Sequence, residues 1–284
     1  MAILEVQHLH KRYEKFHLND VSFSLERGYI MGFIGINGAG KTTTLKSMLN
    51  MVHADSGTVR LLDRDFSEHE VALKQELGIM LGDMNLYVKK RVSLITAVVR
   101  RFYDNWDDEI YADYCRKFSI DQDKRLSELS QGMRTKYFLT LALSHHARLF
   151  ILDEPTTGLD PAARDDLLEI FQKLVEDGEK SVLFSTHITS DLEKCADYIT
   201  YIHQGQIIGS AEKDEFLDTY RVVKGGKEAL TEQLQGKLIS LRNHSFGFSG
   251  LLRSADRQLC GDLQLERPTL DDIMIYYAKK GSTL

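Results

Sequence analysis

Residues 35–42 read Gly-Ile-Asn-Gly-Ala-Gly-Lys-Thr, which fits the pattern G-x-x-x-x-G-K-[ST] at every fixed position. An apolar run without polar alternation, residues 29–34, comes directly before it and predicts a strand buried on both faces. Helical spacing follows over residues 41–51. A strand, a glycine-rich turn and a helix in this order aim backbone N–H groups and a helix N-terminus at one anion.

The lysine and threonine that end this loop indicate a site for ATP with Mg²⁺. Glycines let successive N–H groups turn toward the phosphates, where a Cβ would stand in the way. We expect Lys41 to reach the β- and γ-phosphates and the Thr42 hydroxyl to ligate Mg²⁺. A chance glycine turn is the alternative, but the flanking strand and helix argue against it. The expected phosphate-binding residues are Gly35, Asn37, Gly38, Ala39, Gly40, Lys41, Thr42 and Thr43.

Two carboxylates follow a second buried strand, which is predicted over residues 149–152. The sequence there continues Asp153-Glu154-Pro155. A carboxylate at the C-terminal end of a central strand lies beside the phosphate loop, so Asp153 is expected to hold Mg²⁺ through a coordinated water. Glu154 is then placed to polarise the attacking water as general base. The alternative is a solvated acidic turn.

The remaining pattern predicts a mostly parallel sheet with helices on both faces. Residues 3–9 and 21–25 alternate in polarity and indicate two antiparallel, half-buried strands, and residues 181–185 indicate a third buried strand. Strands that alternate with helices of this length are typical of α/β proteins. Residues 92–119 predict two helices with a break near Asn105.

A further helix is predicted from Ser130 toward His145. The character of the sequence changes near Phe216, where glycines cluster and the predicted elements become short. We therefore expect two domains, residues 1–215 and residues 216–284. Thr269, followed three residues later by Asp272, predicts the start of a last helix with a capping box.

Composition narrows the class of protein. The formal net charge of −6 argues against a nucleic-acid binder, because such proteins usually carry a basic surplus. Three scattered cysteines are expected of a reduced, cytosolic chain. The N-terminus lacks the pattern of a signal peptide, and no apolar run approaches the ~20 residues that span a bilayer. If the protein works at a membrane, we expect another chain to cross it.

The pentapeptide Leu129-Ser130-Gln131-Gly132-Met133 comes between the phosphate loop and Asp153, ahead of a long helix. Here the chain resembles the nucleotide-binding subunit of ABC transporters, over about residues 2–215. In that family a signature of this kind completes the ATP site of the other subunit. The resemblance implies that Ser130, Gln131 and Gly132 act in trans, with a hydroxyl, an amide N–H and a helix N-terminus as donors to a γ-phosphate.

The signature departs from the commonest family pattern, Leu-Ser-Gly-Gly-Gln, at Gln131 and Met133, whereas Ser130 and Gly132 are retained. An ordinary helix capped by serine is the alternative for the pentapeptide alone.

Three other positions match the family. Thr157-Gly158-Leu159-Asp160 resembles its D-loop, whose aspartate links the two sites across a dimer. His187 follows a predicted strand as the family's switch histidine does, and the resemblance implies that it contacts the γ-phosphate and holds the attacking water with Glu154. Tyr13 matches the aromatic residue that stacks on adenine. As isolated residues, a histidine or tyrosine more often serves packing.

One position disagrees with the family. The family normally carries glutamine or glutamate after the strand near residue 80, where it senses Mg²⁺ and the attacking water. By position this residue is Gly82, which has no side chain to offer a metal, and Asp83 is the candidate substitute.

Residues 85–87, 102–107 and 269–274 resemble the small ATPase subunits of bacterial ABC-2-type exporters, some of which export or confer resistance to membrane-active peptides. The resemblance implies an α/β fold of the P-loop NTPase (RecA-like) class. We expect a mostly parallel core sheet, an antiparallel β subdomain, a helical subdomain over about residues 84–145 and a small C-terminal α+β appendage. The helical segment from about Met84 to Lys124 is expected to present the groove that receives a coupling helix of the membrane protein.

The leading hypothesis is therefore an ATPase motor subunit of a transporter, at the cytoplasmic face of the membrane. Its expected partners are ATP, a second copy or a paralogous ATPase, and an integral membrane subunit, with no nucleic acid. The alternative is a soluble ABC ATPase of the translation or DNA-repair type. A nucleotide sensor that does not hydrolyse ATP ranks last, because Glu154 and His187 are both present.

Overall fold

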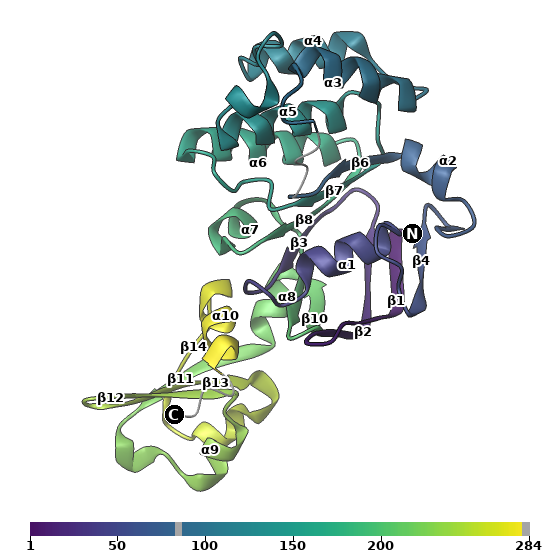
Figure 1. Cartoon of the computed structure of the whole chain (residues 1–284). Helices are drawn as coiled ribbons and strands as arrows, with labels where there is room; N and C mark the ends of the chain where they lie inside the picture. Colours follow the sequence, from purple (N-terminus) through teal and green to yellow (C-terminus); the bar gives the residue numbers. More distant parts are fainter. Residues whose placement is uncertain (83–86, 280–284) are drawn as a thin grey trace.

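Three β-sheets and the helices between them form the structure, a computed structural model that describes residues 1–82 and 87–279 (Figure 1). The strands are β1 Ala2–Arg12, β2 His17–Glu26, β3 Ile30–Ile34, β4 Ser56–Leu61, β5 Arg64–Asp65, β6 Leu77–Met80, β7 Leu149–Asp153, β8 Ser181–Thr186, β9 Tyr198–His203, β10 Gln206–Glu212, β11 Tyr220–Gly225, β12 Ser240–His244, β13 Gly247–Arg253 and β14 Gln264–Glu266. The α-helices are α1 Lys41–Met48, α2 Glu70–Gln75, α3 Val92–Val99, α4 Asp108–Lys117, α5 Gln131–Leu143, α6 Pro161–Val175, α7 Thr189–Cys195, α8 Lys213–Asp218, α9 Glu232–Lys237 and α10 Leu270–Lys279.

The central six-stranded sheet has the order β10-β9-β3-β8-β7-β6 and is parallel except for β10, which pairs antiparallel with β9. The three buried strands predicted from apolar runs are confirmed as β3, β7 and β8, and each of their residues is buried. The prediction of a mostly parallel core sheet is therefore correct.

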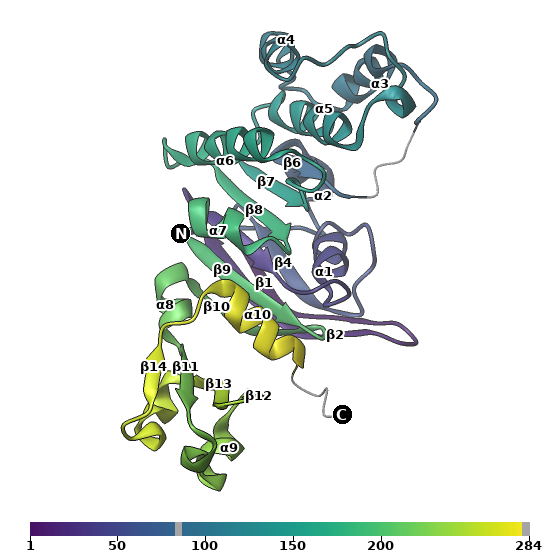
Figure 2. The same cartoon turned by 90° about the vertical axis from the view of Figure 1, so that its left-hand side faces the viewer.

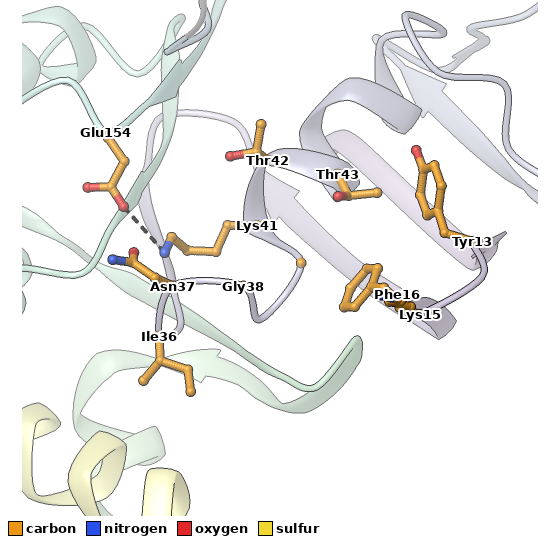
Figure 3. Close-up of a pocket in the computed structure, with 11 residues that line it drawn as sticks. Tyr13, Lys15, Phe16, Ile36, Asn37, Gly38, Lys41, Thr42, Thr43 and Glu154 are labelled. Atoms are coloured by element: carbon orange, nitrogen blue, oxygen red, sulfur yellow. Dashed lines mark ion pairs between the residues drawn. The ribbon is translucent and has the colours of Figure 1, made fainter.

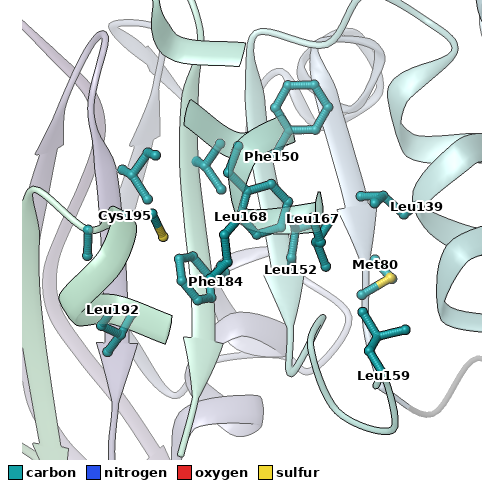
Figure 4. Packing of buried hydrophobic residues seen from close by; sticks show 14 of the residues in the cluster. Met80, Leu139, Phe150, Leu152, Leu159, Leu167, Leu168, Phe184, Leu192 and Cys195 are labelled. Atoms are coloured by element: carbon teal, nitrogen blue, oxygen red, sulfur yellow. The ribbon is translucent and has the colours of Figure 1, made fainter. Parts of the chain in front are cut away.

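Both faces of this sheet are covered because alternate residues of a strand point to opposite sides. Along β7, Phe150 and Leu152 join the apolar cluster that contains Leu168 of α6, whereas Leu149 and Ile151 join the cluster that contains α1. Figure 4 shows the first cluster, with side chains of β7, β8 and α6 in contact and those of α7 beside them. The C-terminal ends of the strands thus lie on a scaffold that is packed from both sides.

The second sheet is antiparallel, with the order β2-β1-β4-β5. The two predicted half-buried strands are confirmed as β1 and β2, which pair Val6 with Phe23 and Leu4 with Leu25. The inward side chains of this sheet belong to the same apolar cluster as α1, so the sheet is fixed against the helix that follows the phosphate loop.

Three helices, α3, α4 and α5, form a separate layer beyond β6, at the top of Figure 1. The predicted break near Asn105 is confirmed, because α3 ends at Val99 and α4 begins at Asp108. A buried hydroxyl group links the three helices: Thr96 Oγ1 lies 2.9 Å from Tyr111 Oη and 3.0 Å from Tyr137 Oη.

The third sheet, β12-β13-β11-β14, lies in the C-terminal part of the chain with α9 and α10. The predicted capping box is confirmed: the Thr269 N–H donates to Asp272 Oδ2 at 3.0 Å, and the Asp272 N–H donates to Thr269 Oγ1 at 3.1 Å. Figures 1 and 2 both place α10 between this sheet and the central sheet. The predicted boundary between residues 215 and 216 falls inside α8 and stays a prediction.

Within residues 1–82 and 87–279, each helix is too short or too polar to cross a bilayer.

Gly205, in the turn between β9 and β10, joins the phosphate loop to the antiparallel sheet. Its N–H donates to Ala39 O at 2.9 Å, and its carbonyl accepts from the Asn19 N–H at 2.8 Å. Its φ is +77°, and a Cβ would lie 1.9 Å from His17 O. No L side chain is compatible with this position.

We therefore predict that Gly205→Ala destabilises the chain more than Gly178→Ala. Gly178 has a similar φ of +72° but nothing within 4 Å of an added Cβ. The left-handed backbone alone costs an L residue about 1–2 kcal/mol, and steric overlap at Gly205 adds roughly 1–3 kcal/mol. Urea unfolding measures both variants, and equal losses of unfolding free energy would contradict the close contact.

Candidate active site

A cavity of about 600 Å³ lies at the C-terminal end of β3 (Figure 3). The phosphate loop and the start of α1 form one wall, an aromatic segment before β2 forms another, and Glu154 lies across from them. The residues that line it are Tyr13, Lys15, Phe16, Ile36, Asn37, Gly38, Gly40, Lys41, Thr42, Thr43 and Glu154. Most of the predicted phosphate-binding residues thus meet in one place.

The loop backbone is held so tightly that two of its glycines cannot be replaced. Gly40 is the N-cap of α1 with φ +115°, and a Cβ there would lie 2.8 Å from Phe16 Cζ. A Cβ on Gly35 would lie 2.6 Å from Ile202 O of β9. The N-terminus of α1 therefore opens directly into the cavity, and its N–H groups favour an anion there.

Lys41 begins α1 and is 6% exposed. Its ammonium group donates to Gly35 O at 2.8 Å and lies 3.3 Å from Glu154 Oε1, the ion pair dashed in Figure 3. A carboxylate and a carbonyl oxygen thus hold this buried ammonium at the floor of the loop, and its contact with the phosphates stays a prediction.

Asp153, the last residue of β7, is 4% exposed and bridges two elements. Its Oδ2 accepts from Thr42 Oγ1 at 2.8 Å, and its Oδ1 accepts from Ser185 Oγ of the neighbouring strand. A hydroxyl and a carboxylate oxygen at one point are the ligand types that Mg²⁺ prefers, so these residues fit the expected ion. Residues 1–82 and 87–279 contain no cluster of three or more His, Cys, Asp or Glu suited to a metal.

Glu154 is placed by strained backbone and three polar neighbours. Its φ is +52°, a left-handed value that costs a non-glycine residue of order 1–3 kcal/mol and that clusters at functional sites. Its N–H donates to the carbonyl and to the hydroxyl of Ser185, both at 3.1 Å. Its Oε2 accepts from Thr157 Oγ1 at 3.2 Å and lies 2.8 Å from His187 Nδ1. The two predicted catalytic side chains are therefore in contact.

Tyr13 lies at the outer rim of the cavity with its ring 44% exposed. The ammonium of Lys11 lies 5.6 Å from the centre of this ring. An exposed aromatic face beside the phosphate loop is available for stacking. Its role toward adenine stays a prediction.

Two residues of the signature, Ser130 and Gly132, lie outside the 600 Å³ cavity. Ser130 is the N-cap of α5, and its Oγ accepts from the Met133 N–H at 3.2 Å. Gly132 lies against Gly158, where an added Cβ would be 2.9 Å from the Gly158 carbonyl. Among the described residues, Ser130 and Gly132 therefore do not line the cavity at the chain's own phosphate loop.

Neither Asp160 nor Gly82 lines the 600 Å³ cavity. Asp160 caps α6 by accepting from the Ala163 N–H at 3.0 Å, and this bond holds the pKa of its carboxyl below the usual value. Gly82 follows β6, and a Cβ there would lie 3.7 Å from Asp153 Oδ2. Gly82 and Gln131 both line a cavity of about 160 Å³ together with Asp153 and Glu154. Asp83 and residues 85–86 lie outside the described residues.

Several residues of the site were not predicted from the sequence, including Lys15 and Ile36 of the cavity lining. Ser185 holds both Asp153 and Glu154, Thr157 holds Glu154, and Phe16 lines the cavity beside Gly40. The signal for Ser185 was its place at the end of a predicted parallel strand, because the ends of such strands meet at one edge of a sheet.

Comparison with known proteins agrees with this geometry. The family described as "ABC transporter" matches residues 18–157, the span that holds the phosphate loop, Asp153 and Glu154. The chain is 30% identical to the "ABC transporter ATP-binding protein YtrB" of Bacillus subtilis (strain 168) over 203 residues, which are 72% of this chain and 69% of the relative. It is 28% identical to the "Bacitracin transport ATP-binding protein BcrA" of Enterococcus faecalis over 209 residues, 72% of this chain and 68% of the relative.

A solved structure titled "Structure of ATP binding subunit of ABC transporter" is 25% identical, with a TM-score of 0.68 over 75% of this chain and 91% of that chain. The expected P-loop NTPase fold is confirmed by this likeness, and the soluble, non-transport alternative is not favoured. Since sequence, fold and the matched span agree, the chain belongs to the ATP-binding subunits of ABC transporters and is an ATPase.

Proposed function

We propose that this chain is the motor of an exporter: two copies bind two ATP molecules head to tail, and hydrolysis drives a separate membrane subunit. One observation carries the proposal. Lys41 and Glu154 line the cavity, whereas Ser130 and Gly132 lie outside it. A γ-phosphate at Lys41 would therefore lack the donors of a signature helix until a second chain supplies them.

The phosphate-binding half of the mechanism belongs to one chain. The N–H groups between Gly38 and Thr43 would hold the phosphates, and the Lys41 ammonium would neutralise the β- and γ-oxygens. Thr42 would ligate Mg²⁺ directly and Asp153 through a water, and the bound ion adds charge neutralisation at the same oxygens. Tyr13 would stack on the adenine ring.

Glu154 would accept a proton from the water that attacks the γ-phosphorus, while the bond from that phosphorus to the β,γ-bridging oxygen breaks and ADP leaves. The support is geometric: Glu154 Oε1 lies 3.3 Å from the ammonium that marks the phosphate position. Thr157 and His187 both contact Oε2 and restrict its rotation. His187 would also contact the γ-phosphate and orient the water, which is the positioning that phosphoryl transfer requires.

The partner's α5 would close the site. Ser130 Oγ, the Gly132 N–H and the helix N-terminus would converge on the γ-phosphate, each favouring negative charge. Asp160 would link the two sites across the dimer. Asp83 is proposed in place of the missing glutamine, since Gly82 offers no side chain. The second chain is a second copy or a paralogous ATPase.

A membrane subunit would dock on the helical layer. A groove of about 220 Å³ is lined by Tyr87, Lys90, Leu94, Ile95, Val98 and Val99. Leu94 is 51% and Val98 47% exposed, on the face of α3 that no other described element covers. An apolar groove of this kind fits the apolar face of a short helix. The occupant we propose is a cytoplasmic helix of the transporter's membrane subunit.

The transported substrate is proposed by class from the relatives. The bacitracin-transport relative is named for a peptide antibiotic, which supports peptides, toxins or drugs as the exported class. We place the motor at the cytoplasmic face of the membrane, held there by its membrane subunit. The net charge of −6 is consistent with the absence of a nucleic-acid partner.

Glu154→Gln is expected to lower kcat for ATP by a factor of about 10²–10⁴, because the amide cannot accept the proton of the attacking water. The amide is nearly the same size, so ATP binding should persist. Phosphate release and equilibrium binding of ATP measure the two effects separately. Full hydrolysis by this variant would exclude Glu154 as the base.

Mixing two inactive variants tests the head-to-tail arrangement. Lys41→Ala removes the phosphate contact and Ser130→Ala the signature hydroxyl, so each homodimer should hydrolyse ATP slowly. Their heterodimer has one site without either lesion, and an equal mixture should recover about one quarter of the unmodified rate if subunits pair at random. A mixture no faster than the mean of its components would contradict a site shared between chains.

Leu94→Glu is expected to weaken co-purification with the membrane subunit at least tenfold while leaving basal ATPase activity of the purified chain unchanged. The matched control is Val71→Glu, an apolar residue of α2 that is 80% exposed and lies outside the groove. Docking would bury the charge of a glutamate at position 94 in an apolar groove, which is unfavourable. A glutamate at position 71 would stay in water, because Val71 lies outside the groove. Equal losses for both variants would refute the docking site.

A further inference from the structure

The C-terminal helix α10 contacts the segment that carries His187. Thr189, the first residue of α7, donates its hydroxyl hydrogen to Asp271 Oδ1 of α10 at 2.7 Å. The two residues are 82 positions apart in the sequence. Thr189 is only 6% exposed, so little water competes with the carboxylate for its hydroxyl.

The chain between this contact and His187 is short and constrained. Ile188 is the only residue between them, and its N–H donates to Thr186 Oγ1 at the end of β8 at 3.0 Å. The backbone of His187 is therefore fixed on one side by β8 and on the other by the start of α7. Displacement of Thr189 moves His187 relative to Glu154, whose Oε2 lies 2.8 Å from the His187 ring.

The inner side of helix α7 packs against the core. Leu192 packs so closely on β3 that a Cβ on Gly32 would lie 2.3 Å from Leu192 Cδ2. Asp191 is 2% exposed and lies 3.8 Å from Arg164 Nε of α6. Two hydrogen bonds reach α7 from residues that follow the central sheet in the described part of the chain. Lys213 Nζ of α8 donates to Glu193 O at 3.0 Å, and the hydrogen bond from Thr189 to Asp271 joins α7 to α10.

Helix α10 is in turn fixed to both of its neighbours. Tyr276 Oη donates to Ser249 Oγ of β13 at 2.9 Å, and Tyr220 Oη lies 3.3 Å from Tyr277 Oη. The ring of Tyr277 also meets the ring of Tyr201 in β9, with 5.4 Å between centres. Because Asp271 lies on α10, a movement of the third sheet that displaces this helix also displaces Asp271.

We propose that Asp271 and Thr189 are positioning residues for hydrolysis, through which the C-terminal residues set the place of His187. The proposal deepens the proposed function and rests on the role of His187 given there. Neither residue lines the cavity that receives ATP, so the bond acts on the site through the position of His187. The rate of hydrolysis therefore depends on the contact, and the affinity for ATP does not.

The test compares single and double variants of the full chain. Thr189→Val removes the donor at nearly constant volume, Asp271→Ala removes the acceptor, and Thr189→Ser keeps the hydroxyl. The expected result is a roughly tenfold fall in kcat for the first two, with KM for ATP within about twofold of the unmodified chain. Thr189→Ser should retain the original kcat, and the double variant should be no slower than either single variant.

Asp272→Ala is the matched control on the same helix. Asp272 caps α10 through Thr269 and has no bond to α7 among the described residues. If this variant lowers kcat as far as Asp271→Ala, the effect arises from the stability of α10 and the proposal is overturned. It is also overturned if KM rises in parallel, or if the effects of Thr189→Val and Asp271→Ala are additive.

His187→Ala separates this proposal from the proposed function. If His187→Ala hydrolyses ATP at the full rate, the role of His187 is wrong and the positioning of that residue has no consequence. If His187→Ala is slow while Thr189→Val keeps its rate, only the link to the C-terminal residues is refuted. Thermal unfolding of each variant confirms that it is folded at the assay temperature.

Discussion

The site depends on the hydrogen bonds that the buried carboxylate of Asp153 accepts. It accepts hydrogen bonds from Thr42, in the first turn of α1, and from Ser185, at the end of β8. One buried side chain thereby fixes the phosphate loop relative to two strands. Such an arrangement requires a sheet whose strand ends cannot slip, and the burial of both faces of β7 and β8 provides that rigidity.

Much of this architecture could be predicted from the sequence, because the core strands are apolar runs and the loop has fixed spacing. The β3, β7 and β8 strands were recognisable for that reason. The β4 strand was not, since most of its residues are exposed and it has no clear alternation. The change of composition near residue 216 falls inside helix α8, Lys213–Asp218, and the domain boundary predicted there stays a prediction.

The parts of the site that escaped prediction depend on register and on distant pairing. Ser185 lies beside Asp153 because β7 and β8 pair those two residues, and an isolated strand pattern contains no such information. The bond between Thr189 and Asp271 needs the C-terminal helix to return to the central sheet. Two of the three departures from the family pattern, Gly82 and Gln131, line the same small cavity beside Asp153 and Glu154.

The single ammonium group of Lys41 can have two anionic partners, the carboxylate of Glu154 and a phosphate of the nucleotide. In the structure it lies 3.3 Å from Glu154, and a phosphate of ATP is the second partner that we propose for it. A carboxylate and a nucleotide therefore compete for a single cation in a buried setting, where each loses much of its hydration. The carboxylate that we propose as the general base would thus weaken the electrostatic attraction between Lys41 and ATP. The affinity for ATP and the rate of its hydrolysis would both depend on how the charge of Lys41 is divided between Glu154 and the nucleotide.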